Sequence, residues 1–292
     1  MSRGVLLLAH GTPESLAEMK AYLTRVRGGR PPSDELVAEM RHNYAAIGGR
    51  SPLTEITYAQ AAALKQELGG ATPVFVGLRH SRPFIDAALA TAVAQGCTDL
   101  VALPLAPQYS TLSVGKYRES VERATPAGVA VRFVESWHDH PTLLDAFAEQ
   151  ARAARASAAY DVLLFTAHSL PERAVRDGDP YPAHVSATAE GVAARLDAGP
   201  ARIAYQSAGR TQEAWLGPTL DDALRDLHAE GRASVLVVPI GFVCDHMEIL
   251  YDIDVAAQAT ARQLGLRLGR SASLNTSALF IRALAEIVRA HG

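Results

Sequence analysis

Two histidines, His10 and His168, each follow a short apolar run. His10 comes after VLLLA, and His168 comes after VLLFTA. Continuous apolar runs of this length are typical of strands in a parallel sheet that is covered on both faces. Ligands of such sheets gather at the carboxyl ends of the strands. Because a free imidazole has a pKa of about 6.5, each histidine is a candidate for proton transfer or metal binding.

Two carboxylates could complete such a site. Glu248 and Asp252 lie four residues apart in a helix expected over 246–262, so they share one helical face. This helix follows the most apolar strand of the chain, which directs its first turn toward the same end of the sheet as His168. An imidazole with a carboxylate suits transient binding of a divalent first-row metal, and the two groups are too few for a structural metal site.

Simpler interpretations of these residues stay open. His168 could cap the turn that follows it or be a hydrogen-bonded core histidine. His10 could form a hydrogen bond at a helix entry before Pro13. The two carboxylates could belong to a solvated acidic first turn, which the helix dipole favours.

Common ligand motifs are absent from the sequence. There is no GxGxxG after a strand and no GxxxxGK[ST], HExxH or GxSxG, so dinucleotide, nucleoside triphosphate, zinc protease and serine hydrolase sites are not indicated. Polar residues at the ends of the expected strands are further candidates: Arg79, Ser81, Gln108, Tyr109, Ser110, Ser169, Gln206, Ser207, Asp245 and His246.

The elements that must position these side chains alternate between apolar strands and amphipathic helices. Strands are expected over 4–9, 73–79, 99–107, 129–136, 161–167, 201–207 and 234–242. Helices are expected over 14–27, 34–46, 54–68, 83–95, 113–124, 141–156, 183–196, 218–230, 246–262 and 276–290. This alternation predicts an α/β fold with two similar doubly wound, Rossmann-like lobes. Each lobe is expected to hold a mainly parallel four-stranded sheet flanked by helices, with a cleft between the lobes.

The two halves of the chain resemble each other beyond the histidines. The segment 99–110 and the segment 234–246 are both apolar strands with an internal proline that open into polar residues. The similarity is too weak to prove common descent. It predicts an N-terminal lobe over 1–142, a C-terminal lobe over 143–275 and a C-terminal helix over 276–292.

Bulk composition excludes several classes of protein. The chain has 292 residues, 48% of them hydrophobic, and a net charge of −3, so nucleic acid is a poor candidate partner. The longest apolar stretch, 233–244, is interrupted by Pro239 and Gly241 and is too short to cross a bilayer. With no secretory signal at the start, the sequence favours the cytoplasm. Cys97 and Cys244 are far apart, which argues against a disulfide framework or a cysteine-bound cluster.

Nine segments, taken together, resemble the ferrochelatases, which insert ferrous iron into a porphyrin. They run in order almost from end to end of the chain: LLLAHGTP (6–13), NYAAIGGRSPL (43–53), VGLRHSRPFI (76–85), LAPQYSTLSVGKY (105–117), ESWHDHP (135–141), TAHSLPER (166–173), GDPYP (178–182), YQSAGRTQEAWLGP (205–218) and VPIGFVCDHMEILYDID (238–254).

The resemblance implies a chelatase-like fold with a porphyrin gripped between the lobes. His168 and Glu248 match the family's essential histidine and glutamate, and both are expected to handle the metal and its protons. Fe²⁺ is then a substrate, and no tightly bound cofactor is expected. We expect no cysteine-bearing extension of the kind that holds an iron–sulfur cluster in some relatives, and no such cluster. A monomer that makes transient contact with neighbouring haem-pathway enzymes is expected.

Further porphyrin contacts carry over by position. Arg27, Tyr44, Ser51 and Tyr117 match groups that hold propionates or line the ring. Asn43 stands where the family pattern has an arginine, which puts one propionate contact in doubt.

Two positions near the expected iron depart from the pattern. His10 occupies a place that is commonly tyrosine in bacterial relatives, so we expect it to line the porphyrin as an axial ligand of the product iron or to hydrogen-bond beside it. Ala256 replaces the last carboxylate of a line that runs through Glu248 and Asp252, so an outer metal site is expected to be weak or absent.

A polar, arginine-rich segment between His10 and Tyr44 bears on which porphyrin is used. It contains Arg25, Arg27, Arg30 and Arg41, whereas enzymes that take protoporphyrin tend to have a longer apolar lip there. A basic lip suits four carboxylates better than two, which favours coproporphyrin III. The alternatives are protoporphyrin IX, a cobalt chelatase that acts on sirohydrochlorin, and a non-enzymatic two-lobed haem-binding protein; the basic segment could also be a solvated loop.

Overall fold

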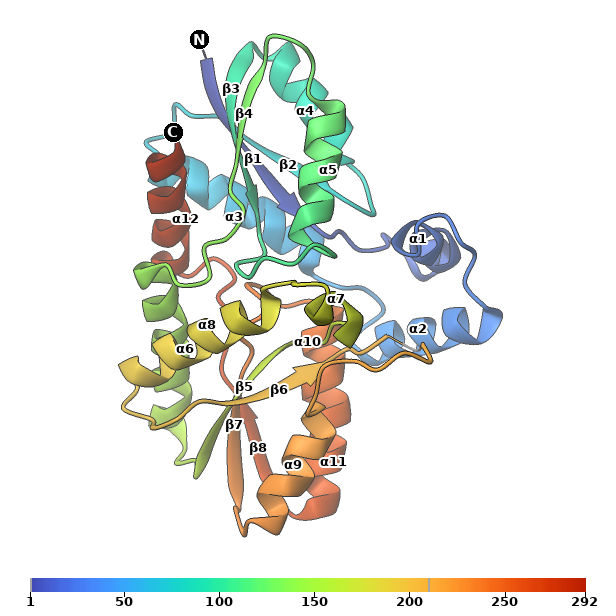
Figure 1. Cartoon of the computed structure of the whole chain (residues 1–292), viewed down its shortest axis with the longest axis vertical. Helices are drawn as coiled ribbons and strands as arrows, with labels where there is room; N and C mark the ends of the chain where they lie inside the picture. Colours follow the sequence, from blue (N-terminus) through green and yellow to red (C-terminus); the bar gives the residue numbers. More distant parts are fainter. Residues whose placement is uncertain (1, 210) are drawn as a thin grey trace.

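The chain forms two parallel sheets of four strands each (Figure 1). The structure, a computed structural model, describes residues 2–209 and 211–292, so Arg210, within the segment 205–218, lies outside the described residues. The first sheet has the order β2-β1-β3-β4 and the second the order β6-β5-β7-β8. The strands are β1 Ser2–Ala9, β2 Val74–Leu78, β3 Cys97–Pro104, β4 Ala130–Phe133, β5 Val162–His168, β6 Arg202–Gln206, β7 Ser234–Val238 and β8 Arg267–Arg270.

Helices cover both faces of each sheet. They are η1 Leu16–Glu18, α1 Met19–Val26, α2 Asp34–Ala46, α3 Leu53–Glu67, α4 Ile85–Ala94, α5 Val114–Ala124, α6 Pro141–Ser157, α7 Glu172–Arg176, α8 Tyr181–Arg195, α9 Leu220–Ala229, α10 Met247–Tyr251, η2 Asp252–Ala257, α11 Gln258–Leu264 and α12 Ala278–His291. In the first lobe α4 and α5 pack on one face of the sheet, and α3 and α12 on the other. In the second lobe α9 and α11 oppose α6 and α8. This arrangement confirms the doubly wound fold in both halves.

The largest apolar core belongs to both lobes. It joins Val5 and Leu7 of β1 to Phe165 of β5 and Leu236 of β7, with α6 and α12 between them. In Figure 1, α12 lies beside α6 and α3, so it contacts helices of both lobes. The predicted boundary near residue 142 falls in the first turn of α6, and the lobe boundaries themselves stay predictions.

Several predicted elements differ from the structure. The helix expected over 246–262 is wrong as a single element, because it consists of α10, the π-helical turn η2 and α11. The strand expected over 234–242 ends at Val238, since Pro239 has no N–H to continue the ladder. The short edge strand β8, with an arginine at each end, was not predicted; charged, short edge strands have weak sequence signals. The short helix α7 was not predicted either.

The two sheets repeat one topology, with β1 and β5 at corresponding central positions. His10 therefore follows β1, as His168 ends β5. Within the described residues, we find no helix with the length and apolar character needed to cross a membrane.

Candidate active site

His168, the last residue of β5, presents one ring nitrogen as a free base. Its Nδ1 lies 2.5 Å from the carbonyl oxygen of Ser169. A carbonyl oxygen only accepts, so the Nδ1–H must donate, which leaves the lone pair of a neutral ring on Nε2. About one third of the His168 side chain, 34%, is exposed, so a reactant can reach this nitrogen.

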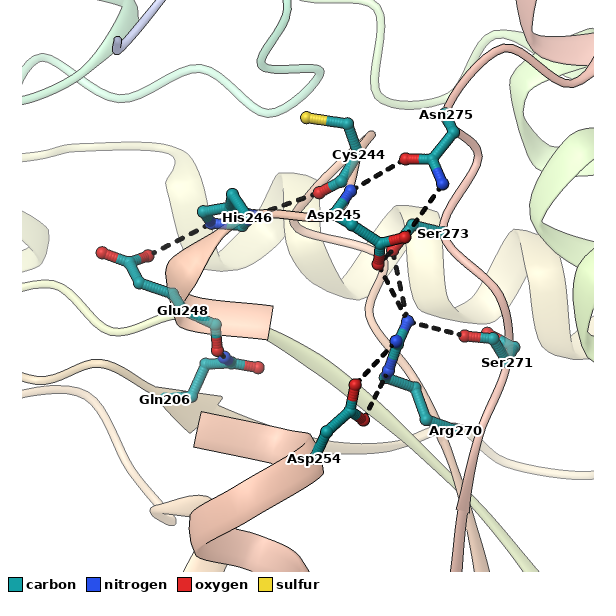
Figure 2. Close-up of polar contacts among 10 residues, drawn as sticks. All are labelled: Gln206, Cys244, Asp245, His246, Glu248, Asp254, Arg270, Ser271, Ser273 and Asn275. Carbon is teal, nitrogen blue, oxygen red and sulfur yellow. Dashed lines mark hydrogen bonds and ion pairs between the residues drawn. The ribbon is translucent and has the colours of Figure 1, made fainter. Parts of the chain in front are cut away.

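Glu248, in the first turn of α10, lies between two imidazoles. Its Oε1 is 3.7 Å from Nε2 of His168, and its Oε2 is 3.6 Å from Nε2 of His246. Figure 2 shows the contact between Glu248 and His246. The Nδ1 of His246 faces the carbonyl oxygen of Cys244 at 3.0 Å, so this ring also turns Nε2 toward the carboxylate. One carboxylate and two bases therefore share one small space.

The Glu248 carboxylate is ionised over a wide range of pH. Burial raises its pKa, but the charges that His168 and His246 carry when they are protonated, together with the hydrogen bond that a protonated His246 can donate, outweigh this effect and lower the pKa to about 2. With 28% of its side chain exposed, the carboxylate can meet a cation from solution. A carboxylate of such low pKa is a weak proton acceptor and a suitable cation ligand.

Two residues at the end of β6, Gln206 and Ser207, contact the helical segment that carries Glu248. Gln206 Nε2 donates to the carbonyl oxygen of Glu248 at 2.9 Å (Figure 2). The next residue, Ser207, donates its hydroxyl to the carboxylate of Asp252 in the π-helical turn. Burial and the negative charge of Glu248 raise the pKa of Asp252 to about 6, against the opposing hydrogen bond from Ser207. Asp252 therefore titrates near neutrality, unlike Glu248.

His10 faces the same groups from the first lobe. Its Nδ1 lies 3.2 Å from the carbonyl oxygen of Gly11 and 3.1 Å from the hydroxyl of Tyr22. Nε2 is the free nitrogen in the tautomer in which Nδ1 donates to that carbonyl oxygen. The ring surface is exposed, yet surrounding protein lowers its pKa to about 4 by desolvation, against the negative charge of Glu248. The charge of Glu248 raises the pKa of His10 and that of a protonated His168 lowers it, both by less than desolvation does.

The imidazole of His80 packs against the imidazole of His10. The ring of His80 is buried, and its centroid is 4.5 Å from that of His10. Burial, followed by the charges of His10 and of nearby arginines, lowers the pKa of His80 to about 2. His80 therefore stays neutral and adds no positive charge beside His10.

Tyr44 joins the arginine-rich segment to the site. Its hydroxyl lies 2.8 Å from that of Thr12, just beyond His10, and its ring belongs to a small core that includes Met247, the first residue of α10. Burial raises the pKa of Tyr44 to about 12. Asn43 beside it is also buried, so α2 is held against α10.

The remaining predicted residues are more dispersed. Tyr117 is buried in the core beneath α5, and burial raises its pKa. Arg27 is exposed at the end of α1, and the hydroxyl of Ser51 accepts from the N–H of Leu53 at the start of α3. Their assignment to the porphyrin stays a prediction.

Tyr22 and His80, which surround His10, were not identified from the sequence, and His246, which faces Glu248, was named only as a candidate at the end of a strand. His80 also follows a strand by a few residues, which is the signal that could have identified it. Tyr22 lies in an ordinary amphipathic helix and had none.

Solved structures with a similar fold are chelatases. The sirohydrochlorin chelatase SirB from Bacillus subtilis subspecies spizizenii, in complex with cobalt, matches 99% of this chain and 94% of its own with a TM-score of 0.59 and 12% identity. CbiX, the terminal enzyme for biosynthesis of siroheme in denitrifying bacteria, matches 99% of both chains with a TM-score of 0.57 and 18% identity. At these identities the likeness concerns the fold alone.

Sequence relatives are much more similar. A protein of Thermus thermophilus named ferrochelatase is 43% identical and covers 98% of both chains. One of Deinococcus radiodurans with the same name is 40% identical over 98% of this chain and 94% of its own. A coproporphyrin III ferrochelatase of Geobacillus thermodenitrificans is 38% identical, with the same coverage. The family model described as Ferrochelatase matches residues 2–292. The chain therefore belongs to the ferrochelatase family of metal-inserting enzymes.

Proposed function

We propose that this ferrochelatase inserts Fe²⁺ into coproporphyrin III, bound between the two lobes. Curated relatives at about 40% identity carry two names, ferrochelatase and coproporphyrin III ferrochelatase. The observation that carries the catalytic part of the proposal is the pair formed by His168 Nε2 and Glu248 Oε1 at 3.7 Å. This distance leaves both atoms free of a direct hydrogen bond.

Each group of this pair suits one half of the reaction. Insertion of Fe²⁺ into a porphyrin releases the protons of two pyrrole N–H groups, while the iron loses its water. Glu248, with a pKa of about 2, remains an anion that can hold the cation, and His168 has a neutral nitrogen that can accept a proton. His246, on the other carboxylate oxygen at 3.6 Å, offers a second base for the second proton.

His10 and the residues around it are proposed to bind the porphyrin. Nε2 of His10 is directed away from the Gly11 carbonyl, and we assign it as an axial ligand of the product iron. The proposed porphyrin contacts are Arg27, Asn43, Tyr44, Ser51 and Tyr117.

The exposed arginines of the segment before Tyr44 favour coproporphyrin over protoporphyrin IX. Arg27, Arg30 and Arg41 are exposed, whereas Arg25 donates to the carbonyl oxygen of His80 at 2.7 Å and is half-buried. Four propionates would gain more from these cations than two, because charge-assisted hydrogen bonds to carboxylates are the stronger ones.

Iron is a substrate in the family, and we propose no tightly bound cofactor. Because Cys97 and Cys244 are the two cysteines of the sequence and lie far apart in it, we also propose no iron–sulfur cluster. A monomer in the cytoplasm, in transient contact with other haem-pathway enzymes, is also proposed. A sirohydrochlorin chelatase and a non-enzymatic haem-binding protein are the competing functions.

One anaerobic assay distinguishes these functions. Purified protein is mixed with Fe²⁺ and coproporphyrin III, and the loss of free porphyrin is followed by absorbance, with protoporphyrin IX and sirohydrochlorin with Co²⁺ in parallel. We expect the fastest turnover with coproporphyrin III and a loss of at least about a hundredfold in His168→Ala and Glu248→Gln, the scale of losing general acid–base catalysis. Turnover by His168→Ala equal to that of the wild type would refute the assigned role, and faster use of protoporphyrin IX would refute the substrate.

A further inference from the structure

The segment 245–257 carries Glu248 in the first turn of α10, which passes without a break into the π-helical turn Asp252–Ala257. The N-cap residue His246 makes no side-chain capping hydrogen bond, and π-helical turns are rare. Contacts from outside the segment therefore bear on the position of its first turn and of the Glu248 carboxylate.

Arg270, the last residue of β8, contacts this segment on both sides of Glu248 (Figure 2). Its Nε and Nη2 donate to the two carboxylate oxygens of Asp254, each at 2.8 Å. Its Nη1 donates to Oδ1 of Asp245 at 3.2 Å. Only 15% of the Arg270 side chain is exposed, so solvent screens these contacts weakly. A guanidinium is the one side chain that can form this planar two-bond contact with a carboxylate and still reach a second one.

Asp245 is fixed further by the linker between β8 and α12. Ser273 donates its hydroxyl to Oδ1 of Asp245 at 2.7 Å, and Asn275 Nδ2 donates to Oδ2 at 2.9 Å. The N–H of Asp245 donates in turn to Oδ1 of Asn275 at 2.9 Å. The carbonyl oxygen of Asn275 accepts from Nε2 of the fully buried Gln60 on α3, also at 2.9 Å. The contacts of Arg270 thus continue into a helix of the first lobe.

From this network we infer that Arg270 is a positioning residue for metal binding. By joining Asp245 to Asp254 it holds the segment between them, and with it the Glu248 carboxylate at 3.7 Å from His168 and 3.6 Å from His246. The inference rests on the proposed role of Glu248 as the iron-binding carboxylate. Without the guanidinium, Asp245 and Asp254 lose their shared cation, and the two ends of the segment are free to separate.

The test distinguishes an effect on metal binding from an effect on porphyrin binding. Arg270→Met keeps the aliphatic stem and removes the guanidinium. We measure kcat, the KM for Fe²⁺ and the KM for coproporphyrin III, and the binding of Zn²⁺ alone by calorimetry. We expect the KM for Fe²⁺ to rise and the Zn²⁺ affinity to fall about tenfold, the lower end of effects seen when support around a metal ligand is removed. The KM for the porphyrin is expected to stay unchanged. A merely structural role would lower stability without this split.

Two further variants test the contact itself. Asp254→Asn leaves the contact between Arg270 and Asp245 in place, so it gives a smaller shift in the same direction even if Arg270→Met fails to fold. Arg270→Lys restores the charge without the planar pair of bonds and is expected to be intermediate.

Controls separate failure of this inference from failure of the proposed function. Arg202→Met removes another ion pair of the same lobe, with Glu230 at 2.8 Å, and is expected to behave as the wild type. If Arg270→Met and Asp254→Asn match Arg202→Met in the KM for Fe²⁺ and in Zn²⁺ affinity, the positioning role is refuted. If Glu248→Gln turns over as fast as the wild type, the proposed function of Glu248 fails, whatever Arg270→Met shows.

Discussion

Three histidines of the candidate site share one hydrogen-bonding arrangement. His10, His168 and His246 each turn Nδ1 toward a backbone carbonyl oxygen within two residues of themselves. The carbonyl lies within two residues of each ring, and at His10 the hydroxyl of Tyr22 also lies near the same nitrogen. When Nδ1 donates to the carbonyl, Nε2 of a neutral ring can accept a proton or bind a metal.

His10 is the residue whose role is easiest to isolate. Because desolvation lowers its pKa to about 4, it is neutral and able to bind iron at a pH where a free histidine, with a pKa of about 6.5, would be protonated. We predict that the iron–coproporphyrin complex of the wild-type protein shows an imidazole-type absorption spectrum that is constant from about pH 8 to about pH 5.5. His10→Ala should lose this spectrum, and His10→Tyr should replace it with a phenolate-type one.

His228→Ala, on the exposed surface of α9, serves as the control for removal of a histidine. A His10→Ala complex with the wild-type spectrum would show that His10 does not bind the iron. A spectral transition of the wild-type complex near pH 6.5 would contradict the lowered pKa.

At the level of elements, one glycine sets how closely the loop after β7 approaches the end of β5, where His168 lies. A Cβ on Gly241 would lie 2.6 Å from Cα and 2.7 Å from Cβ of Ala167, the residue before His168. The N–H of Gly241 donates to the carbonyl oxygen of Thr166 at 3.0 Å. The chain leaving β7 therefore touches the backbone of β5, and only a residue without a side chain allows this contact.

Gly241→Ala is predicted to damage the site more than the fold. The added methyl group must push the end of β5 or the start of the loop aside, which moves His168 relative to Glu248. We expect a loss of about 1–3 kcal/mol in the free energy of unfolding, typical of overpacking, and a fall in kcat of about a hundredfold, the cost of misplacing a reacting group by about 1 Å. Urea unfolding and the iron-insertion assay measure the two effects.

Gly191→Ala is the control for a methyl group added away from His168. Its Cβ would lie 2.7 Å from a methyl group of Leu144, where α8 packs on α6. Because this methyl group ends a flexible side chain and alanine favours a helix, the variant should lose less stability than Gly241→Ala and keep the wild-type kcat. Equal losses of kcat in the two variants would mean that the close contact at Gly241 has no special connection to His168.

The sequence predicted the elements where periodicity is strong and missed those where it is weak. The apolar runs of β1 and β5 and their terminal histidines were predicted because burial on both faces produces an unbroken apolar pattern. The π-helical turn after Tyr251 has no such signal, since its composition is that of a helix, and Asp254 within it pairs with Arg270, which is 16 residues further along the chain. The place of His246 beside Glu248 could not be predicted either, because it depends on the geometry of the loop after β7.

At the level of the whole molecule, the lobes are joined by a shared core and by buried polar contacts. Gln108, which follows β3, donates to the carbonyl oxygen of Ile240 and to the hydroxyl of Thr188, both at 3.1 Å. These partners belong to the second lobe. Since the largest apolar core also includes β1 and β5, the two lobes should unfold together although each has its own sheet.

Asp179 provides the test of this coupling. Its buried carboxylate, just before α8, accepts from the hydroxyl of Ser110 at 2.9 Å and from the N–H and hydroxyl of Thr111 at 2.7 Å, both residues following β3. All three bonds go to Oδ2, and Oδ1 accepts from the N–H of Tyr181 at 3.1 Å. The amide of Asp179→Asn offers one acceptor oxygen, so its NH2 group must face either the donors at Oδ2 or the N–H of Tyr181, and the free energy of unfolding should fall by about 1–3 kcal/mol. Calorimetry should still show one transition, at a lower temperature. Asp145→Asn, which breaks the half-exposed pair with Arg195, should cost less than about 1 kcal/mol. Two resolved transitions in the wild type would show that the lobes unfold separately, because contacts that cross between them would then contribute too little to couple the two sheets.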